Sequence, residues 1–569
     1  MKVTYYNRFI LLFSLFGLLV LGACKKVETE PRDWIREDLV WDDQDKNATV
    51  AGFFLNSVYT YIPTGFNRID GDYLDAASGD AIPSRNNTQV EFYTNGRISV
   101  VNNPDPYWGN SYAGIRAANI FLSNIDKVPM AAITKQYWKA EARFIRALMY
   151  FELVKRYGGV PLVGNKIFTV EDDLEIPRNN YAECVNYIVS ECDAIKDSLR
   201  LEKGANYGTS DWGRIARGAA IALKCRTYLY AASPLFNGGG FETNANIKAL
   251  TGYPTYDASR WQKVIDASEE LIGMGYYALQ PSFNNVFVVN RNTEVILNKQ
   301  GATNSNIESI NAPSGYATPA LSLGRTSATS ELVDAFPMNN GLAINSTSPT
   351  SGYNPANPYL NRDPRFYSTI FYNGATWLRR GVQTFEGGLD KPGGTTIQTK
   401  TGFYVRKFMA DFSNNTAYTN QSHNFILFRY AEILLNYAEA LNEMGRTEDA
   451  VTQLKLIRAR AGITAGANAR YGIPTGVTQS DLRTLIFNER RIELAFEEHR
   501  FWDVRRWKIA PAVLNTNVNG VKITKNADNT FTYQTQPAAN LLFTNKLYHM
   551  PLPYSEIVKN SKLIQNEGW

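Results

Sequence analysis

The chain has 569 residues, and its 59 lysines and arginines against 54 aspartates and glutamates give a formal net charge of +5 at pH 7. So small an imbalance does not supply the clustered positive surface of a nucleic-acid-binding protein, and we expect no nucleic-acid partner. Four cysteines are too few for a disulfide framework in a chain of this length. We therefore expect isolated, buried thiols.

The first 23 residues have the features of an export signal. Lys2 and Arg8 precede the apolar run 9–21, which is too short to span a bilayer comfortably. The sequence LGAC, ending at Cys24, resembles a bacterial lipobox, in which the cysteine is lipidated and becomes the first residue of the mature chain. We interpret residues 1–23 as a lipoprotein signal peptide and residues 24–46 as a lipidated tether. The alternative is an ordinary signal peptide with an incidental cysteine.

Apolar residues recur at helical spacing in two blocks, at about 47–275 and about 425–510. In the second block, residues 434–461 read as two helices joined by a turn at Gly445. Small residues at the contact would let these helices approach closely, as in tetratricopeptide hairpins, which stack into a superhelix. In the first block, one helix before Gly158–Gly159 carries an apolar face made of Ala140, Phe144, Ala147, Leu148, Phe151 and Val154.

A long irregular insertion separates the two blocks, at about residues 281–424. Proline, asparagine and glycine recur every few residues there, which predicts loops and short strands. An insertion of this length in a helical scaffold is usually functional. We therefore predict that residues 47–569 form a single, mainly α domain. It is a tetratricopeptide-like helical-hairpin superhelix with long loop-rich insertions.

The densest cluster of charges is the stretch NERRIELAFEEHRFWDVRRW, residues 488–507. If residues 488–498 form one helix, Glu489, Glu493 and Glu497 form a stripe of like charges, which would repel one another if only water surrounded them. Thr478 and Asp481 are spaced as an N-terminal cap for that helix. Catalytic carboxylates usually face each other from different elements, whereas these come from one segment. We interpret the stretch as a buried structural ion network that includes Glu489, Arg490, Arg491, Glu493, Glu497 and Arg500.

Sequence motifs of common enzymes are absent. The chain has only three histidines, and it contains no HExxH, no GxSxG and no glycine-rich phosphate loop. We expect no metal, no cofactor and no enzymatic activity. A carboxylate-dependent hydrolase remains an alternative, because its two acidic residues need no motif.

Five segments in the same order resemble one family. The stretch 488–507 is similar to a signature of the SusD/RagB-type outer-membrane nutrient-uptake lipoproteins of Bacteroidetes. The other four segments are FIRALMYFELVKRYGGVPLV (144–163), NRDPRFYSTIFYNG (361–374), RYAEILLNYAEALNEMG (429–445) and MPLPYSEIVKNSKLIQNEGW (550–569). With the lipobox they cover essentially the whole chain. Glu567 departs from the pattern, since the family usually has proline there.

The resemblance implies a mostly α-helical fold with four tetratricopeptide-like hairpins and a glycan-binding surface formed by the loops between them. Members of the family cap a SusC-type TonB-dependent transporter and deliver oligosaccharides to it, and they are not enzymes. The expected partners are therefore this transporter, an oligosaccharide or polysaccharide ligand, and the outer membrane through the lipid on Cys24, with the protein facing the cell surface. The alternatives are a carboxylate-dependent glycoside hydrolase and a non-binding structural lid of the transporter.

Loop aromatics are the candidates for contacts with sugar. Aromatic faces stack on pyranose rings, and charged or amide groups bond the hydroxyls. Each ring could instead be a packed core side chain, because large aromatics are commonly buried. The spacing of Trp108 to Tyr112 and Ile115 favours a core-facing helical turn. The candidate glycan-binding residues are Tyr73, Arg85, Tyr93, Trp108 and Tyr316.

Overall fold

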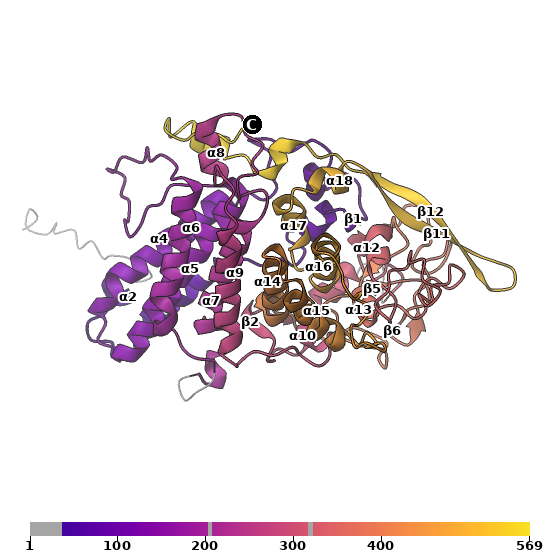
Figure 1. Cartoon of the computed structure of the whole chain (residues 1–569). Helices are drawn as coiled ribbons and strands as arrows, with labels where there is room; N and C mark the ends of the chain where they lie inside the picture. Colours follow the sequence, from indigo (N-terminus) through magenta and orange to yellow (C-terminus); the bar gives the residue numbers. More distant parts are fainter. Residues whose placement is uncertain (1–36, 203–206, 317–321) are drawn as a thin grey trace, which may run out of the picture.

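A computed structural model describes residues 37–202, 207–316 and 322–569 of the chain. The signal peptide, Cys24 and much of the predicted tether lie outside these ranges. Helices account for 41% of the structure and strands for 11%, so the prediction of a mainly α fold is confirmed. Long helices occupy one side of the molecule, and the loops and short strands gather on the other (Figure 1).

Helices of both predicted blocks are present. Helix α2 (Glu37–Val40) lies within the stretch predicted as tether. The first block contains α3 (Thr49–Tyr59), α4 (Tyr107–Asn124), α5 (Ala132–Tyr157), α6 (Tyr181–Ile195), α7 (Arg217–Ala232), α8 (Ala245–Thr251) and α9 (Ser259–Gly273). The second contains α14 (Tyr430–Glu443), α15 (Thr447–Ala461), α16 (Gln479–Glu493), α17 (Arg500–Arg506) and α18 (Ala510–Leu514). Among the described residues, none of the helices combines the length and the apolar character needed to cross a membrane.

The apolar face predicted for α5 is buried. Its six residues Ala140 to Val154 are all at most 3% exposed and belong to the main core. The helix ends at Tyr157, because Gly158 adopts a φ of +80° that other residues rarely take. At the next residue, Gly159, the backbone lies close to the backbone of Asn179. A Cβ atom there would lie 2.1 Å from the Asn179 carbonyl oxygen.

The helices pack side by side in one continuous stack. Helix α4 packs against α5, α5 against α6, and α6 against α7. Helix α7 then packs against α9, and α9 packs against α14. Helix α14 then packs against α15 and α16, so the predicted hairpin around Gly445 is confirmed. The contact between α9 and α14 means that the insertion leaves the stack and returns to it without interrupting the helical packing.

A two-stranded sheet closes the base of this insertion, since β2 (Val295–Lys299) pairs antiparallel with β10 (Phe425–Arg429). The excursion between them contains short elements around a second core. Its helices are α11 (Asn306–Asn311), α12 (Ser330–Ala335) and α13 (Pro364–Thr369), after α10 (Asn285–Val288), which precedes β2. Its strands are β3 (Thr303–Asn304), β4 (Thr326–Ala328), β5 (Ile370–Phe371), β6 (Thr376–Trp377), β7 (Arg380–Gly381), β8 (Tyr404–Val405) and β9 (Gln421–Ser422).

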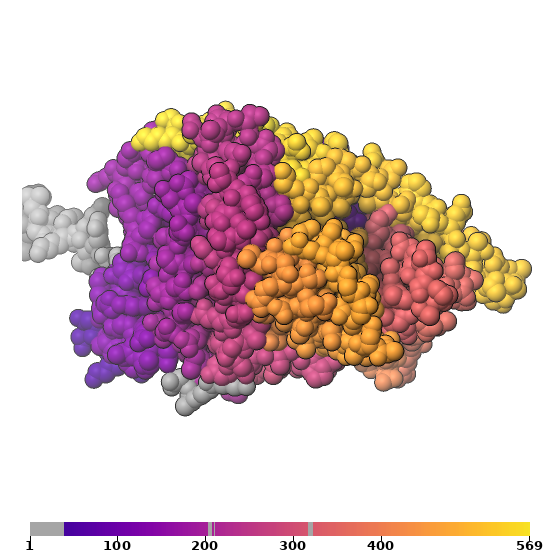
Figure 2. Space-filling view, in the orientation of Figure 1, coloured from indigo at the N-terminus to yellow at the C-terminus, as the bar shows by residue number. Residues whose placement is uncertain are grey.

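The C-terminal segment crosses both parts of the molecule, as its yellow colour shows in the space-filling view (Figure 2). It begins with a long hairpin of β11 (Asn517–Lys525) and β12 (Phe531–Asn540), which we did not predict. The backbone N–H of Asn519 in β11 donates to the Glu331 carboxylate of α12 at 3.0 Å. The short helix α19 (Tyr554–Ile557) follows near the end of the chain. The short strand β1 (Ala81–Pro83) pairs with β4, and thereby joins the N-terminal loops to the insertion.

The three cysteines in the described part of the chain, Cys184, Cys192 and Cys225, are free and buried. This agrees with the expectation of isolated thiols. Burial raises the pKa of Cys225 to about 11, so it is a protonated, inert side chain at neutral pH.

Candidate functional site

The charged stretch 488–507 has a different backbone from the one predicted. Helix α16 ends at Glu493, and the chain then turns, with Phe496 and Glu498 at φ values of +62° and +60°. The prediction of one helix through Glu498 is therefore wrong. The turn nevertheless places Glu497 close to Glu493, because both carboxylates contact the guanidinium group of Arg429.

The partners of these glutamates come from distant parts of the chain. Glu493 contacts Arg429 at 2.6 Å and Arg365 at 2.9 Å, and it also pairs with Arg460. Arg365 belongs to α13 in the insertion, whereas Arg460 lies in α15 and Arg429 at the end of β10. The cluster therefore joins the insertion to the helical stack.

The other members extend the same arrangement. Glu489 contacts Arg365 and Arg458, each at 2.7 Å, and Glu497 contacts Lys407 at 2.7 Å. Further pairs of the stretch are Arg490 with Asp503, and Arg491 and Arg500 with Asp80. Apart from Arg491, each of these charged residues of the stretch is less than 9% exposed.

Electrostatics keep Glu493 ionised in this buried position. Burial alone would raise the pKa of its carboxyl group, but the charges of Arg460, Arg429 and Arg365 outweigh burial and hold that pKa well below its usual range. A carboxylate with its oxygens occupied by guanidinium groups is not available to a substrate. Glu493 is therefore buried and paired on every side, and a binding surface has to be sought elsewhere.

The aromatic residues proposed as sugar platforms are buried, so their selection is wrong. Tyr73 is 0% exposed, Tyr93 1%, Trp108 6% and Tyr316 2%. The Tyr73 ring lies between those of Phe408 and Phe496, and Tyr93 packs edge-on against Phe501. Rings covered on both faces by protein cannot stack on a pyranose.

Trp108 and Tyr316 have equally clear structural roles. Trp108 packs edge-on against Tyr157 at the end of α5, as the core-facing alternative for this residue predicted. Tyr316 packs against Trp377, and the Arg380 guanidinium lies 3.6 Å from the centre of its ring. These two rings complete the main core and the core of the insertion, respectively.

Arg85 differs from the four aromatics because part of its side chain reaches the surface. The side chain is 21% exposed and pairs with the buried Asp72 carboxylate at 3.2 Å. The backbone oxygen of Arg85 accepts a hydrogen bond of 2.8 Å from the ammonium group of Lys400. This bond links the first loop, after β1, to the loop that precedes β8.

A polar hollow of about 520 Å³ lies beside this link. Three segments form it: the end of β1, the loop before β8 and the hairpin β11–β12. Lys522 is exposed and Gln536 is partly exposed, so both can reach a ligand in the hollow. The lining residues are Ser84, Glu386, Lys391, Thr396, Gln398, Thr399, Lys400, Lys522, Gln536, Pro537 and Ala538.

The chemistry of this hollow suits a ligand with many hydroxyl groups. Hydroxyl, amide and ammonium groups can donate to or accept from hydroxyls in several directions. Only one of the lining side chains is a carboxylate, Glu386, and it pairs with Lys391 at 2.7 Å. In the described ranges, no group of three or more histidine, cysteine, aspartate or glutamate side chains is placed to hold a metal ion.

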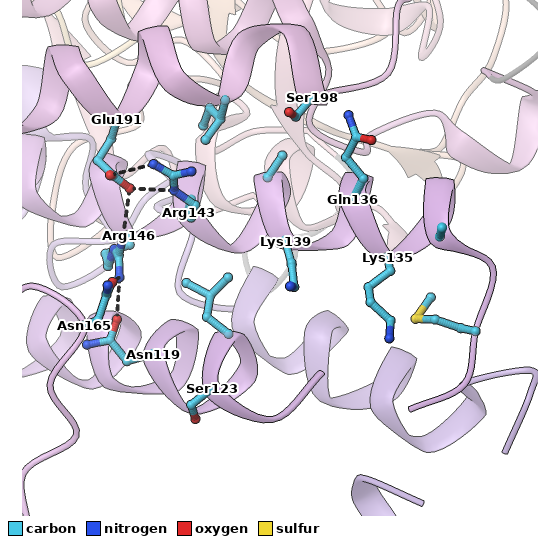
Figure 3. Close-up of a pocket in the computed structure, with 15 residues that line it drawn as sticks. Asn119, Ser123, Lys135, Gln136, Lys139, Arg143, Arg146, Asn165, Glu191 and Ser198 are labelled. Atoms are coloured by element: carbon cyan, nitrogen blue, oxygen red, sulfur yellow. Dashed lines mark hydrogen bonds and ion pairs between the residues drawn. The ribbon is translucent and has the colours of Figure 1, made fainter. Parts of the chain in front are cut away.

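A second, larger hollow of about 850 Å³ lies on the helical side of the molecule, between α4, α5 and α6. Figure 3 shows Lys135 and Lys139 pointing the same way from α5, with Arg143 and Arg146 near Glu191. Arg143 and Arg146 contact Glu191 at 2.8 and 2.9 Å. None of the residues that line this groove is aromatic.

Comparison with known proteins connects this architecture to a family. A stack of paired helices that pack one against the next is the architecture of helical-repeat proteins. A family model described as "SusD family" matches residues 291–569, and one described as "Starch-binding associating with outer membrane" matches residues 53–229. The chain belongs to the SusD family. The resemblance of the five segments is thus confirmed.

Relatives match over nearly their whole length. SusD-like protein P2 of Formosa agariphila is 26% identical, over 96% of this chain and 97% of its own. A solved SusD-like protein from Bacteroides fragilis is 28% identical with a TM-score of 0.76, over 94% of this chain and 99% of its own. A SusD-like carbohydrate binding protein from Bacteroides fragilis shares the fold, with 23% identity and a TM-score of 0.71 over 92% and 100% of the two chains.

Proposed function

We propose that this protein is a surface lipoprotein that captures oligosaccharides and delivers them to a SusC-type TonB-dependent transporter in the outer membrane. The observation that carries the proposal is the polar hollow around Lys400, because its hydroxyl, amide and ammonium groups match the hydroxyls of a sugar. The family supports it as well. One family description names starch binding and outer-membrane association, and one solved relative is named as carbohydrate binding.

Binding without hydrolysis is the part of the proposal that separates it from a glycoside hydrolase. Hydrolysis requires two carboxyl groups that face the scissile bond, about 5–10 Å apart. The hollow offers Glu386 alone, and that carboxylate is held by Lys391. The five carboxylates of the stretch 488–507 are engaged in ion pairs, most of them buried.

Substitutions in the hollow should weaken glycan binding. Once a panel of polysaccharides in affinity gels has identified a ligand, Lys400→Gln and Gln536→Ala should each reduce the affinity for its oligosaccharide. The expected reduction is about threefold to tenfold, which corresponds to one hydrogen bond. Isothermal titration measures the change. Thr535→Ala is the matched control, because neighbouring strand residues point to opposite faces of β12.

Each outcome of this experiment separates the alternatives. Full affinity in both Lys400→Gln and Gln536→Ala would place the binding surface elsewhere. Retardation by none of the polysaccharides would favour a non-binding lid of the transporter. Release of reducing ends from a retained polysaccharide would favour the hydrolase.

Anchoring through Cys24 is tested separately. Cys24→Ala removes the thiol that would be lipidated, so the variant should appear in the soluble periplasmic fraction or remain unprocessed. Fractionation of cells followed by immunoblotting measures this, with Cys225→Ala as a control that keeps the lipobox. Wild-type amounts of the Cys24→Ala variant in the outer membrane would show that the lipid is not the anchor.

A further inference from the structure

The groove between α4, α5 and α6 is not used by the proposed glycan site, and its charge is strongly biased. Four cations, Lys135, Lys139, Arg143 and Arg146, line it together with one carboxylate, Glu191. Asp126 at the edge pairs with Lys139 at 2.6 Å but is itself 67% exposed. The groove and its edge therefore carry four positive charges and two negative charges.

Arg146 is the buried end of this set. Its side chain is 4% exposed. One terminal nitrogen donates to Asn165 at 2.6 Å and to Asn119 at 2.8 Å, and the other donates to Glu191 at 2.9 Å. Its Nε is buried and has no hydrogen-bond partner among the described residues. A buried guanidinium with an unused donor at the wall of a hollow is a place where a ligand oxygen would gain a charge-assisted bond.

The cations are spaced along α5 like the side chains of an extended peptide. Lys135, Lys139 and Arg143 are four residues apart, so with a rise of about 1.5 Å per residue they recur every 6 Å or so. Alternate side chains of an extended chain recur about every 6.6–6.8 Å. Carboxylates at alternate positions of a peptide would therefore meet successive cations.

The rest of the lining fits a peptide better than a sugar. It has no aromatic ring to stack on a pyranose, whereas the partly exposed Leu122 and Met130 offer apolar contacts for the intervening side chains. Gln136 and Ser198 offer an amide and a hydroxyl for backbone groups (Figure 3). Stacked helical repeats characteristically present such concave binding surfaces.

We propose that this groove binds an extended acidic segment of a partner protein, with carboxylates at alternate positions along α5. The interaction is independent of the glycan site, since the two hollows share no lining residue. The affinity of the partner should therefore depend on the spacing of its carboxylates and not only on their number.

The probe that tests this pattern is a labelled, terminally blocked peptide SESESES. It is compared by fluorescence anisotropy with SSEEESS, which has the same composition and charge, and with SQSQSQS. We expect SESESES to bind more tightly than SSEEESS and SQSQSQS not to bind. The double variant Lys135→Gln/Lys139→Gln should weaken SESESES about tenfold, as expected for two partly exposed ion pairs. The control is Lys559→Gln, which makes the same substitution at an exposed lysine outside the groove. This variant should retain the affinity for SESESES.

Other results would overturn the proposal. Equal affinity for SESESES and SSEEESS would mean that the groove only attracts negative charge. An unchanged affinity in the double variant would place peptide binding elsewhere. Polygalacturonate that binds with the same dependence on Lys135 and Lys139, and that displaces the peptide, would make the groove a site for acidic glycans. Both lysines are partly exposed, so unfolding is not expected to confuse the measurement, and a thermal melt of the variant checks this.

Discussion

Replacing Glu493 with alanine should lower the free energy of unfolding by about 3–5 kcal/mol, the usual effect of removing one partner from a buried ion pair. The side chain is 0% exposed and contacts Arg365, Arg429 and Arg460. The substitution leaves their positive charges inside the molecule with fewer acceptors. Chemical denaturation followed by intrinsic fluorescence measures the loss, and the affinity of the folded fraction for glycan should not change.

A matched surface substitution gives the comparison. Glu448 pairs with Arg470 at 2.9 Å, but its side chain is 63% exposed, so Glu448→Ala should change stability by less than about 1 kcal/mol. A Glu493→Ala protein that unfolds like wild type but no longer binds glycan would contradict the scaffold interpretation. It would place the stretch 488–507 in the binding site.

Acid should remove the same stabilisation. The guanidinium groups around Glu493 and Glu489 hold the pKa values of these carboxyls below their unfolded values, although burial alone would raise them. The ionised pairs therefore contribute fully above an unfolded pKa of about 4.3, and their contribution is lost as the pH falls toward the folded values. The stability of Glu493→Ala should accordingly depend less on pH below about pH 4.3 than that of wild type.

Gly159→Ala should destabilise the protein by about 2–3 kcal/mol, the upper part of the usual range for an over-packed position. The new Cβ would lie 2.1 Å from the backbone oxygen of Asn179, and a backbone atom cannot turn away as a flexible side chain can. The contact is also fixed by the Arg178 guanidinium, whose Nε donates to the Gly159 oxygen at 2.7 Å. The measurement is the same denaturation experiment.

Gly273→Ala is the matched control for this effect. Gly273 is the last residue of α9, and an added Cβ there meets no atom within 4 Å. Alanine favours a helix over glycine by up to about 1 kcal/mol, so this variant should be neutral or slightly more stable. If Gly159→Ala were as stable as Gly273→Ala, the backbone around Asn179 would have to be able to move apart at little cost.

Local patterns in the sequence predicted the helical scaffold well. The apolar face of α5, its end at Gly158, the hairpin around Gly445 and the Thr478 cap, whose side chain accepts from the Asp481 N–H, are all present. Each depends on residues within a few helical turns of one another. The missed end of α16 at Glu493 shows the limit of this reasoning, since distant guanidinium groups hold Glu493 and Glu497 on either side of a turn.

The candidate sugar contacts failed for a related reason. The sequence around Tyr73 and Tyr93 predicts a loop, and a loop position favours exposure. In the structure Tyr93 ends a short 3-10 helix, and both rings are inserted into the core. The residues next to either tyrosine in the sequence do not indicate which distant side chains cover its ring. The hairpin β11–β12 did leave a local signal, because Val521 and Ile523 alternate with polar residues, as do Phe531 and Tyr533 across an Asn-rich turn. That hairpin supplies Lys522 and Gln536 to the hollow.

Because α9 packs against α14 and β2 pairs with β10, the insertion begins and ends at neighbouring points of the helical stack. The entropic cost of closing a flexible loop rises by only about 0.6 kcal/mol for each doubling of its length. Residues 300–424 could therefore be exchanged with small effects on the helices only if the contacts with the rest of the chain are kept. These contacts include the β1–β4 pair, the Glu331–Asn519 bond, and Arg365 and Lys407 beside Glu493 and Glu497. Ligand preference could thus change through wholesale replacement of this region, while the helical half stays constant. A chimaera that exchanges residues 300–424 between two relatives would separate these two properties.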